Sequence, residues 1–196
     1  MQTYAPPVIT ARVMSRGAAA TGALVVGFAL LTAAAAQIEI PLWFTPVPIT
    51  GQTFAVLLAG AALGSAAGAS SQLVYVALGA AGLPFYAGGE SGWDVVSGAT
   101  GGYLIGFVAA AWFVGYLAER RHDRNVATAM PAFLAGNAII YVFGVTWLAH
   151  QLGVSATKAV ELGMAPFVIG DLVKIAVAGM LLPSAWKLVG SLKDDT

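Results

Sequence analysis

Long apolar runs broken by very few charges constrain this chain more than any other feature. Asp, Glu, Lys and Arg together make up 9% of the 196 residues, whereas 59% are hydrophobic and the mean hydropathy is +0.82. A water-soluble domain of this length needs far more charge to cover its surface. We therefore expect an all-α integral membrane protein that forms one compact bundle over residues 1–196.

The remaining composition excludes several classes of partner and site. The 9 basic residues offset the 9 acidic ones, so no basic surface is available for nucleic acid. The absence of cysteine excludes a disulfide framework, a thiolate zinc site and a cysteine nucleophile. The 24 glycines instead favour helices packed closely in lipid.

The transmembrane spans can be counted from the apolar runs, because one crossing takes about 20 residues. The stretch 50–84 is too long for one untilted helix at about 1.5 Å per residue, so we interpret it as a hairpin that turns near residues 64–68. A loop at the membrane interface covers 37–48, and a Gly-rich polar segment covers 85–100. The prediction is a bundle of six transmembrane helices, with the other four at about 17–36, 101–117, 127–148 and 166–188.

The distribution of basic residues orients this bundle, because cytoplasmic loops are enriched in Lys and Arg. Six spans with both termini cytoplasmic, and with tails at 1–15 and 190–196, leave only Lys158 outside. A single span over 50–84 would move the Arg-rich loop at 120–124 to the other side and remove the asymmetry. The basic residues placed inside are Arg12, Arg16, Arg120, Arg121, Arg124, Lys187 and Lys193.

The first span allows two further interpretations. Its basic start and Ala-rich end also resemble a cleaved secretory signal, although its apolar run exceeds the roughly 7 to 15 residues of a signal core. Small residues recur four apart at Ala19, Ala23 and Gly27, which indicates either a face for docking a partner helix or chance in an Ala-rich run. Two similar ladders favour internal packing, one at Gly60, Gly64 and Gly68 and one at Gly98, Gly102, Gly106 and Ala110.

The strongest candidate site is an acid and a base in the last span. An ionisable residue inside lipid costs at least about 2.5 to 3.5 kcal/mol, so it tends to persist where it pairs or binds something. Asp171 and Lys174 are three apart and share a helix face, about 7 and 12 Å below the outer boundary if the helix starts at Pro166. They could line an outward-open pocket or merely neutralise each other.

Neighbouring segments bring further polar and aromatic groups toward the same outer end. Ligand pockets combine mostly apolar walls with a few convergent polar groups. Asn137 and Tyr141, one turn apart, could face the pocket or bond across helices, and the sequence leaves both open. The other candidates are Gln52, Tyr103 and the loop that contains Tyr86, Gly88, Gly89 and Glu90.

Several chemistries find no support in the sequence. No Gly-x-x-x-x-Gly-Lys-Ser/Thr run is present to bind ATP, and no Gly-x-Ser-x-Gly elbow is present. His122 and His150 fall at opposite ends of a span, which argues against a two-histidine metal site. We expect neither an enzyme nor a bound cofactor or metal.

Four motifs, in order along most of the chain, carry a family resemblance: PVPITGQTF at 46–54, LGAAGLPF at 78–85, GATGGYLIGF at 98–107 and PFVIGDLVK at 166–174. Together they closely resemble the BioY family, the biotin-specific substrate-binding components of energy-coupling factor (ECF) transporters. One departure is Ala99, which stands where the family usually has Pro before Thr-Gly-Gly-Tyr.

The resemblance implies a six-helix bundle in a prokaryotic cell membrane, with a biotin pocket near its outer surface capped by the loops after spans one and three. It also implies two kinds of partner, a membrane-embedded coupling protein and a pair of ABC-type ATPases, so that ATP is used only by partner subunits. By resemblance, Asp171 and Lys174 contact the substrate. The family's polar contact from the loop after span three falls among Gly88, Gly89 and Glu90, without fixing the position.

The chemistry of biotin suggests roles for these residues. Lys174 would pair with a biotin acceptor, chiefly the carboxylate, while Asp171 would either accept from a ureido N–H or orient Lys174. Trp43, Phe85 and Tyr103 would line the apolar part of the pocket. The alternative function is a self-sufficient secondary carrier, for biotin or another small vitamin, in which Asp171 takes up a proton.

Overall fold

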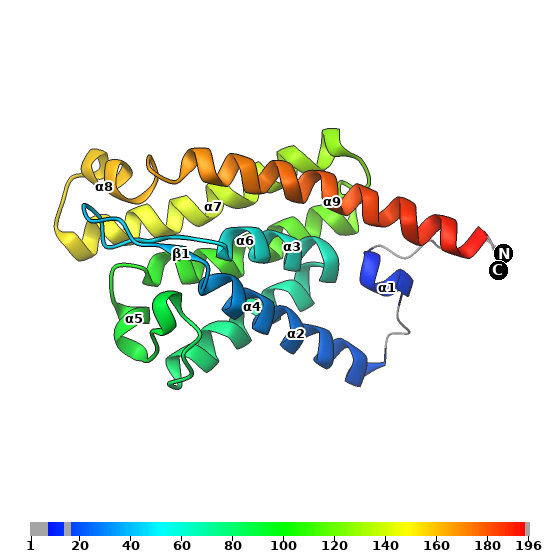
Figure 1. Cartoon of the computed structure of the whole chain (residues 1–196), viewed down its shortest axis with the longest axis horizontal. Helices are drawn as coiled ribbons and strands as arrows, with labels where there is room; N and C mark the ends of the chain where they lie inside the picture. Colours follow the sequence, from blue (N-terminus) through cyan, green and yellow to red (C-terminus); the bar gives the residue numbers. More distant parts are fainter. Residues whose placement is uncertain (1–7, 14–16, 195–196) are drawn as a thin grey trace.

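The computed structural model describes residues 8–13 and 17–194 and is almost entirely helical. Figure 1 shows the longer helices running roughly along one common axis. The parts of the predicted tails at 1–7, 14–15 and 195–196 lie outside the described residues. The helices are α1 (Ile9–Val13), α2 (Ala18–Ala36), α3 (Gln52–Leu63), α4 (Ser65–Ala80), α5 (Trp93–Ser97), α6 (Gly101–Glu119), α7 (Val126–Leu152), α8 (Ala156–Gly163) and α9 (Val168–Asp194), with a 3-10 turn, η1 (Ala87–Gly89).

Helices occupy every segment that the sequence predicts as a span. Within the described residues, α2, α6, α7 and the 168–187 part of α9 are long and apolar enough to cross a membrane. The 12 residues of α3 would reach only about 18 Å, and the 16 residues of α4 about 24 Å. The lengths and apolar composition of four helices agree with a helical membrane protein, and the count of six spans stays a prediction.

The predicted break inside 50–84 is confirmed at Gly64, between α3 and α4. Gly64 has φ +89°, a conformation that favours glycine. The two helices then pack closely, since a Cβ on Gly68 would lie 2.8 Å from the Cα of Gly60. The carboxylate of Glu119, on α6, accepts from the backbone N–H of Ser65 at 2.8 Å and so caps the start of α4.

The glycine ladders serve internal packing, as predicted. A Cβ on Gly102 would lie 2.6 Å from the carbonyl oxygen of Phe143, and one on Gly106 would lie 3.0 Å from the Cα of Ile140. These close approaches let α6 lie directly against α7. The stripe on α2 differs, because Ala19, Ala23 and Gly27 are all exposed.

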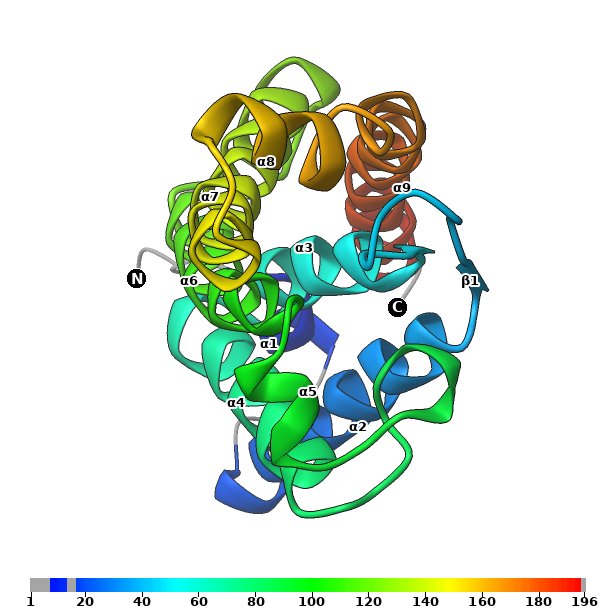
Figure 2. The same cartoon turned by 90° about the vertical axis from the view of Figure 1, so that its left-hand side faces the viewer.

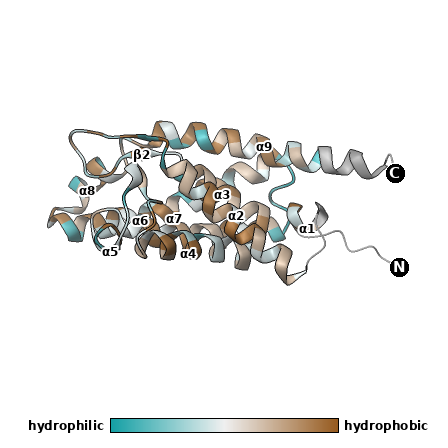
Figure 3. Ribbon diagram, turned by 60° about the horizontal axis from the view of Figure 1, so that its bottom comes forward, coloured by the Kyte–Doolittle hydropathy of each residue, from teal (hydrophilic) through white to brown (hydrophobic). Residues whose placement is uncertain are grey.

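The outer surface of the bundle suits lipid. Figure 3 shows hydrophobic residues along most of the helices and hydrophilic ones chiefly toward the two ends. Large apolar side chains point outward on several spans, among them Leu30, Ile105, Val142 and Ile169. A soluble monomer rarely exposes so much apolar surface, so these faces are the ones expected to meet acyl chains.

The two ends of the bundle differ. Helix α1 and the last turns of α9 lie at one end in Figure 1, whereas α5, α8 and β1 lie at the other. At this second end, α2 and α3 are joined by a segment that forms two short antiparallel strands, β1 (Glu39–Ile40) and β2 (Ile49–Thr50), with Glu39 opposite Thr50. The backbone N–H of Gly51 donates to Ala35 at 3.1 Å, which brings the two ends of the segment together.

Candidate functional site

A cavity of about 440 Å³ opens at the end of the bundle that carries α5, α8 and β1. Figure 2 looks onto this end. Its walls come from the α2–α3 connection, the start of α3, the loop around η1, and helices α6, α7 and α9. The volume lies within the roughly 300 to 1,000 Å³ of small-molecule pockets.

The acid and base of the last span lie in this cavity wall, as the sequence predicts. Lys174 Nζ lies 2.9 Å from Asp171 Oδ1, across one turn of α9. Asp171 is only 3% exposed, whereas Lys174 is partly open to the cavity. The pair does not face the acyl chains, because both side chains line the cavity.

Asp171 is surrounded by protein donors. Its Oδ1 accepts from Lys174 and, at 3.1 Å, from the hydroxyl of Thr53. Its Oδ2 accepts from the amide of Asn137 at 3.1 Å and from the hydroxyl of Tyr141. Four donors match the roughly four lone-pair sites of a carboxylate. This arrangement leaves the carboxylate no free acceptor site for a ligand N–H.

Lys174 retains donor capacity. An ammonium group carries three N–H donors. Within the described part of the chain, one is used by Asp171 and one by Thr53, whose Oγ1 lies 3.2 Å from Nζ. The third is available to a molecule in the cavity. Among the residues that line the cavity, Lys174 is the only cation.

A second polar group comes from the start of α3. Gln52 is 7% exposed and lines the cavity. Its Oε1 accepts from the hydroxyl of Thr50 at 2.8 Å, and its Nε2 donates to the hydroxyl of Tyr75 at 2.6 Å. Because Nε2 carries two hydrogens, the fixed amide keeps one donor for a ligand.

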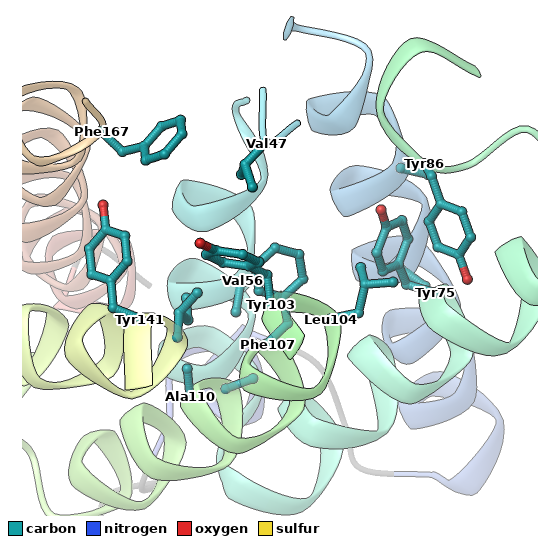
Figure 4. Packing of buried hydrophobic residues seen from close by; sticks show 14 of the residues in the cluster. Val47, Val56, Tyr75, Tyr86, Tyr103, Leu104, Phe107, Ala110, Tyr141 and Phe167 are labelled. Carbon is teal, nitrogen blue, oxygen red and sulfur yellow. The ribbon is translucent and has the colours of Figure 1, made fainter. Parts of the chain in front are cut away.

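Aromatic side chains form much of the apolar wall. Figure 4 shows Tyr103, Tyr141 and Phe167 around one space, and all three line the cavity. The Tyr103 hydroxyl donates to the carbonyl of Gly163 at 2.7 Å, so it holds the last turn of α8. Its ring lies directly on Gly144, where any side chain would overlap it.

The loop around η1 contributes backbone and an acidic rim. Gly88 and Glu90 line the cavity, as does Glu39 from β1. The loop is fixed by Tyr86, whose hydroxyl donates to the carbonyl of Val76 at 2.7 Å. Burial raises the pKa of the Tyr86 phenol above its ordinary value, so the hydroxyl stays a neutral donor at physiological pH.

The structure separates the residues predicted for the site into two groups. Three predicted residues do not line the cavity: Trp43 is 96% exposed, Phe85 packs against the apolar core, and Gly89 lies beside the lining residue Gly88. The predicted residues that do line it are Asp171, Lys174, Gln52, Tyr103, Tyr141, Tyr86, Gly88 and Glu90.

Among the lining residues that the sequence does not single out, Thr53 and Glu39 matter most for the chemistry of the cavity. Thr53 follows Gln52 directly, and a threonine after a glutamine carries no signal that would mark it as a partner of the last span. Glu39 was treated only as part of an interface loop. Asn137, which the sequence left undecided, donates to Asp171. The amide turns its nitrogen toward Asp171 because a carboxylate oxygen accepts hydrogen bonds, and its buried Oδ1 has no hydrogen-bond partner among the described residues.

Metal binding finds no support in the described residues. No group of three or more His, Asp or Glu side chains there is arranged to hold a metal ion. Fold and cavity therefore define a class: a helical membrane protein that can hold a small organic molecule near one end of its bundle.

A profile of the BioY family matches residues 9–191, and the chain belongs to that family. It is 39% identical over 149 residues to the biotin transporter BioY of Rhizobium etli, covering 72% of this chain and 79% of that one. It is 40% identical over 157 residues to the biotin transporter BioY of Thermotoga maritima, covering 79% and 88%. The relative from Rhodobacter capsulatus, also a biotin transporter BioY, is 42% identical over 163 residues, covering 78% and 85%.

The fold is also found in a solved structure. The crystal structure of the S-component for biotin from an ECF-type ABC transporter matches with a TM-score of 0.81 over 89% of this chain and 94% of that one, at 23% identity. The family resemblance read from four motifs is thus confirmed. The relatives are named as transporters, which agrees with the prediction that the chain is not an enzyme.

Proposed function

We propose that this chain binds biotin in the cavity between α3, α6, α7 and α9 and delivers it for uptake as the S component of an ATP-driven ECF transporter. The proposal is supported by relatives that are named as biotin transporters and that this chain matches over most of their length. The single observation that carries it is the Lys174 ammonium group, which lies at the cavity wall with one N–H unused by the described residues.

The cavity fits the chemistry of biotin. Biotin has an anionic carboxylate, a ureido ring with two donors and one acceptor, and an apolar thiophane with a valeryl tail. Tyr103, Phe107 and Phe167 give apolar walls for the ring and tail. Lys174 would donate to a biotin acceptor, chiefly the carboxylate, in a charge-assisted bond.

Of the two roles open to Asp171, orienting Lys174 is the better supported. Four protein donors already occupy its carboxylate. A ureido N–H would have to displace one of them.

We further propose six spans with both termini cytoplasmic, so that the cavity opens outward in the cell membrane. Arg120, Arg121 and Lys187 lie toward the end that carries α1, whereas Lys158 lies on α8 at the cavity end. This distribution follows the cytoplasmic enrichment of basic residues. In this topology α3 and α4 would each cross the membrane once, as two short spans.

The energy for uptake would come from partners, a membrane-embedded coupling protein and ABC-type ATPases. The sequence has no Walker-type phosphate loop of its own. The exposed small residues Ala19, Ala23 and Gly27 of α2 are the proposed docking stripe, because small side chains let a partner helix approach closely.

Two measurements test these proposals. Titration of labelled biotin, thiamine and riboflavin onto the purified chain should show binding of biotin alone, and binding of another vitamin in its place would refute the ligand. Uptake into liposomes should need ATP and the partner subunits. Uptake driven by a proton gradient with this chain alone would instead establish the secondary carrier.

A further inference from the structure

The segment of residues 38–48, which joins α2 to α3 and is called the lid segment below, has two chemically different sides. One side lines the cavity and includes Glu39, Leu42, Thr45 and Val47. The other side is apolar and exposed to an unusual degree, and Trp43 is the extreme case at 96%. The exposed apolar side chains are Ile38 (71%), Ile40 (59%), Trp43 (96%) and Phe44 (43%).

We call these four exposed side chains the patch. The rings of Trp43 and Phe44 pack edge to face with centroids 5.4 Å apart. Exposing four large apolar side chains within seven positions of one loop costs free energy in water. Such a cluster marks a surface that contacts something apolar. Trp43 makes no contribution to the cavity wall, so lining the site does not explain it.

The position of the patch indicates what covers it. Thr45 Oγ1 donates to the carbonyl of Leu162 at 2.9 Å, which ties the lid segment to the last turn of α8, the helix that precedes α9. There α9 exposes Ile169 (79%) and Leu172 (50%) to the outside of the bundle. In Figure 2, β1 lies at the edge of the bundle between α2 and α9. The patch therefore lies at the cavity end of the bundle, the end at which the apolar helix α9 begins.

We propose that Ile38, Ile40, Trp43 and Phe44 insert into the bilayer interface at the cavity end and anchor the lid segment to lipid. Trp is enriched at this depth because its ring is apolar and its N–H reaches polar headgroups. The lid segment is thereby held between two environments, with the ligand cavity on one side and the membrane on the other. This inference goes beyond the proposed ligand and does not depend on it.

The consequence concerns entry to the cavity. The ends of the lid segment are fixed by the Gly51 to Ala35 hydrogen bond and its middle by Thr45. Outward movement of the segment must carry Trp43 and Phe44 through the interface. The bilayer thus takes part in opening the cavity.

The absence of native cysteine makes a direct test simple. Trp43→Cys would carry a nitroxide spin label in lipid nanodiscs, and its collision rates with apolar oxygen and with a water-soluble nickel chelate would be measured. Two matched labels set the scale, Ile169→Cys for lipid and Lys158→Cys, on exposed α8, for water. Phe44→Cys repeats the measurement at an adjacent position.

The proposal expects a high ratio of oxygen to nickel accessibility at position 43, as at 169, with and without biotin. A ratio like that at position 158 would place the lid segment in water and overturn it. A fall in both collision rates on adding biotin would also overturn it, because position 43 would then close over the ligand instead of resting in lipid.

Discussion

Replacement of Thr53 by Val tests the geometry of the site without changing its charge or shape. The Thr53 hydroxyl accepts from Lys174 at 3.2 Å and donates to Asp171 at 3.1 Å, so it fixes the ammonium group from α3 while Asp171 fixes it from α9. Valine keeps the volume and removes both bonds. Hydrogen bonds to charged groups are worth about 1.5 to 3 kcal/mol each in mutational series.

Only part of that free energy should appear as lost affinity. The Lys174 to Asp171 bond at 2.9 Å remains, and Lys174 is open enough for water to replace one partner. We expect a loss of about 1 to 2 kcal/mol in biotin binding, or about 5- to 30-fold in Kd. Isothermal titration calorimetry of biotin onto the purified variant measures this directly.

Thr53→Ser is the matched control, because serine restores the hydroxyl and removes only a methyl group. Its affinity should stay close to that of the wild type. Equal affinity in the valine variant would show that Thr53 does not hold Lys174 for the ligand. An equal loss in both variants would point to packing of the methyl group instead, and either outcome would refute the reasoning.

Three further changes test the fold around the site. Tyr103→Phe leaves the Gly163 carbonyl without its donor, which should cost about 1 to 3 kcal/mol of stability and lower the unfolding temperature. Gly102→Ala brings a Cβ to 2.6 Å from the backbone of α7, and this overpacking should cost about 1 to 3 kcal/mol or more, measured by thermal unfolding in detergent. Burial raises the pKa of Asp123, in the loop after α6, above its ordinary 3.8, although the Trp186 N–H opposes this. The folded state then holds this proton more tightly than the unfolded state, so the free energy of unfolding should fall as pH rises from about 3.8 through the raised pKa. In unfolding curves measured across that pH range, Asp123→Asn should remove this dependence on pH.

The helices of the predicted spans were predictable because each follows from local composition, whereas the short helices α1, α5 and α8 lie outside those spans and were not predicted. Apolar runs of about 20 residues define spans, and one glycine with positive φ, Gly64, breaks the run that is too long for a single helix. The pairing of Asp171 with Lys174 was predictable for the same reason, because a separation of three fixes their distance on a helix.

Contacts between distant segments could not be predicted in the same way. Thr53 and Asp171 are 118 positions apart, and only the packing of α3 against α9 brings them together. Trp43 misled the sequence interpretation, because an aromatic residue in a capping loop can face either the cavity or the lipid. The side it takes depends on how residues 38–48 cross the bundle end, which no local pattern encodes.

The most direct measurement is a calorimetric titration of biotin onto the purified wild-type chain and onto Lys174→Ala. Biotin should saturate the wild type at one site, and the variant should bind at least about tenfold more weakly, a loss of about 1.4 kcal/mol or more, because the cavity loses the one cation that the described residues place in its wall. Equal affinities would remove Lys174 from the site and contradict the account.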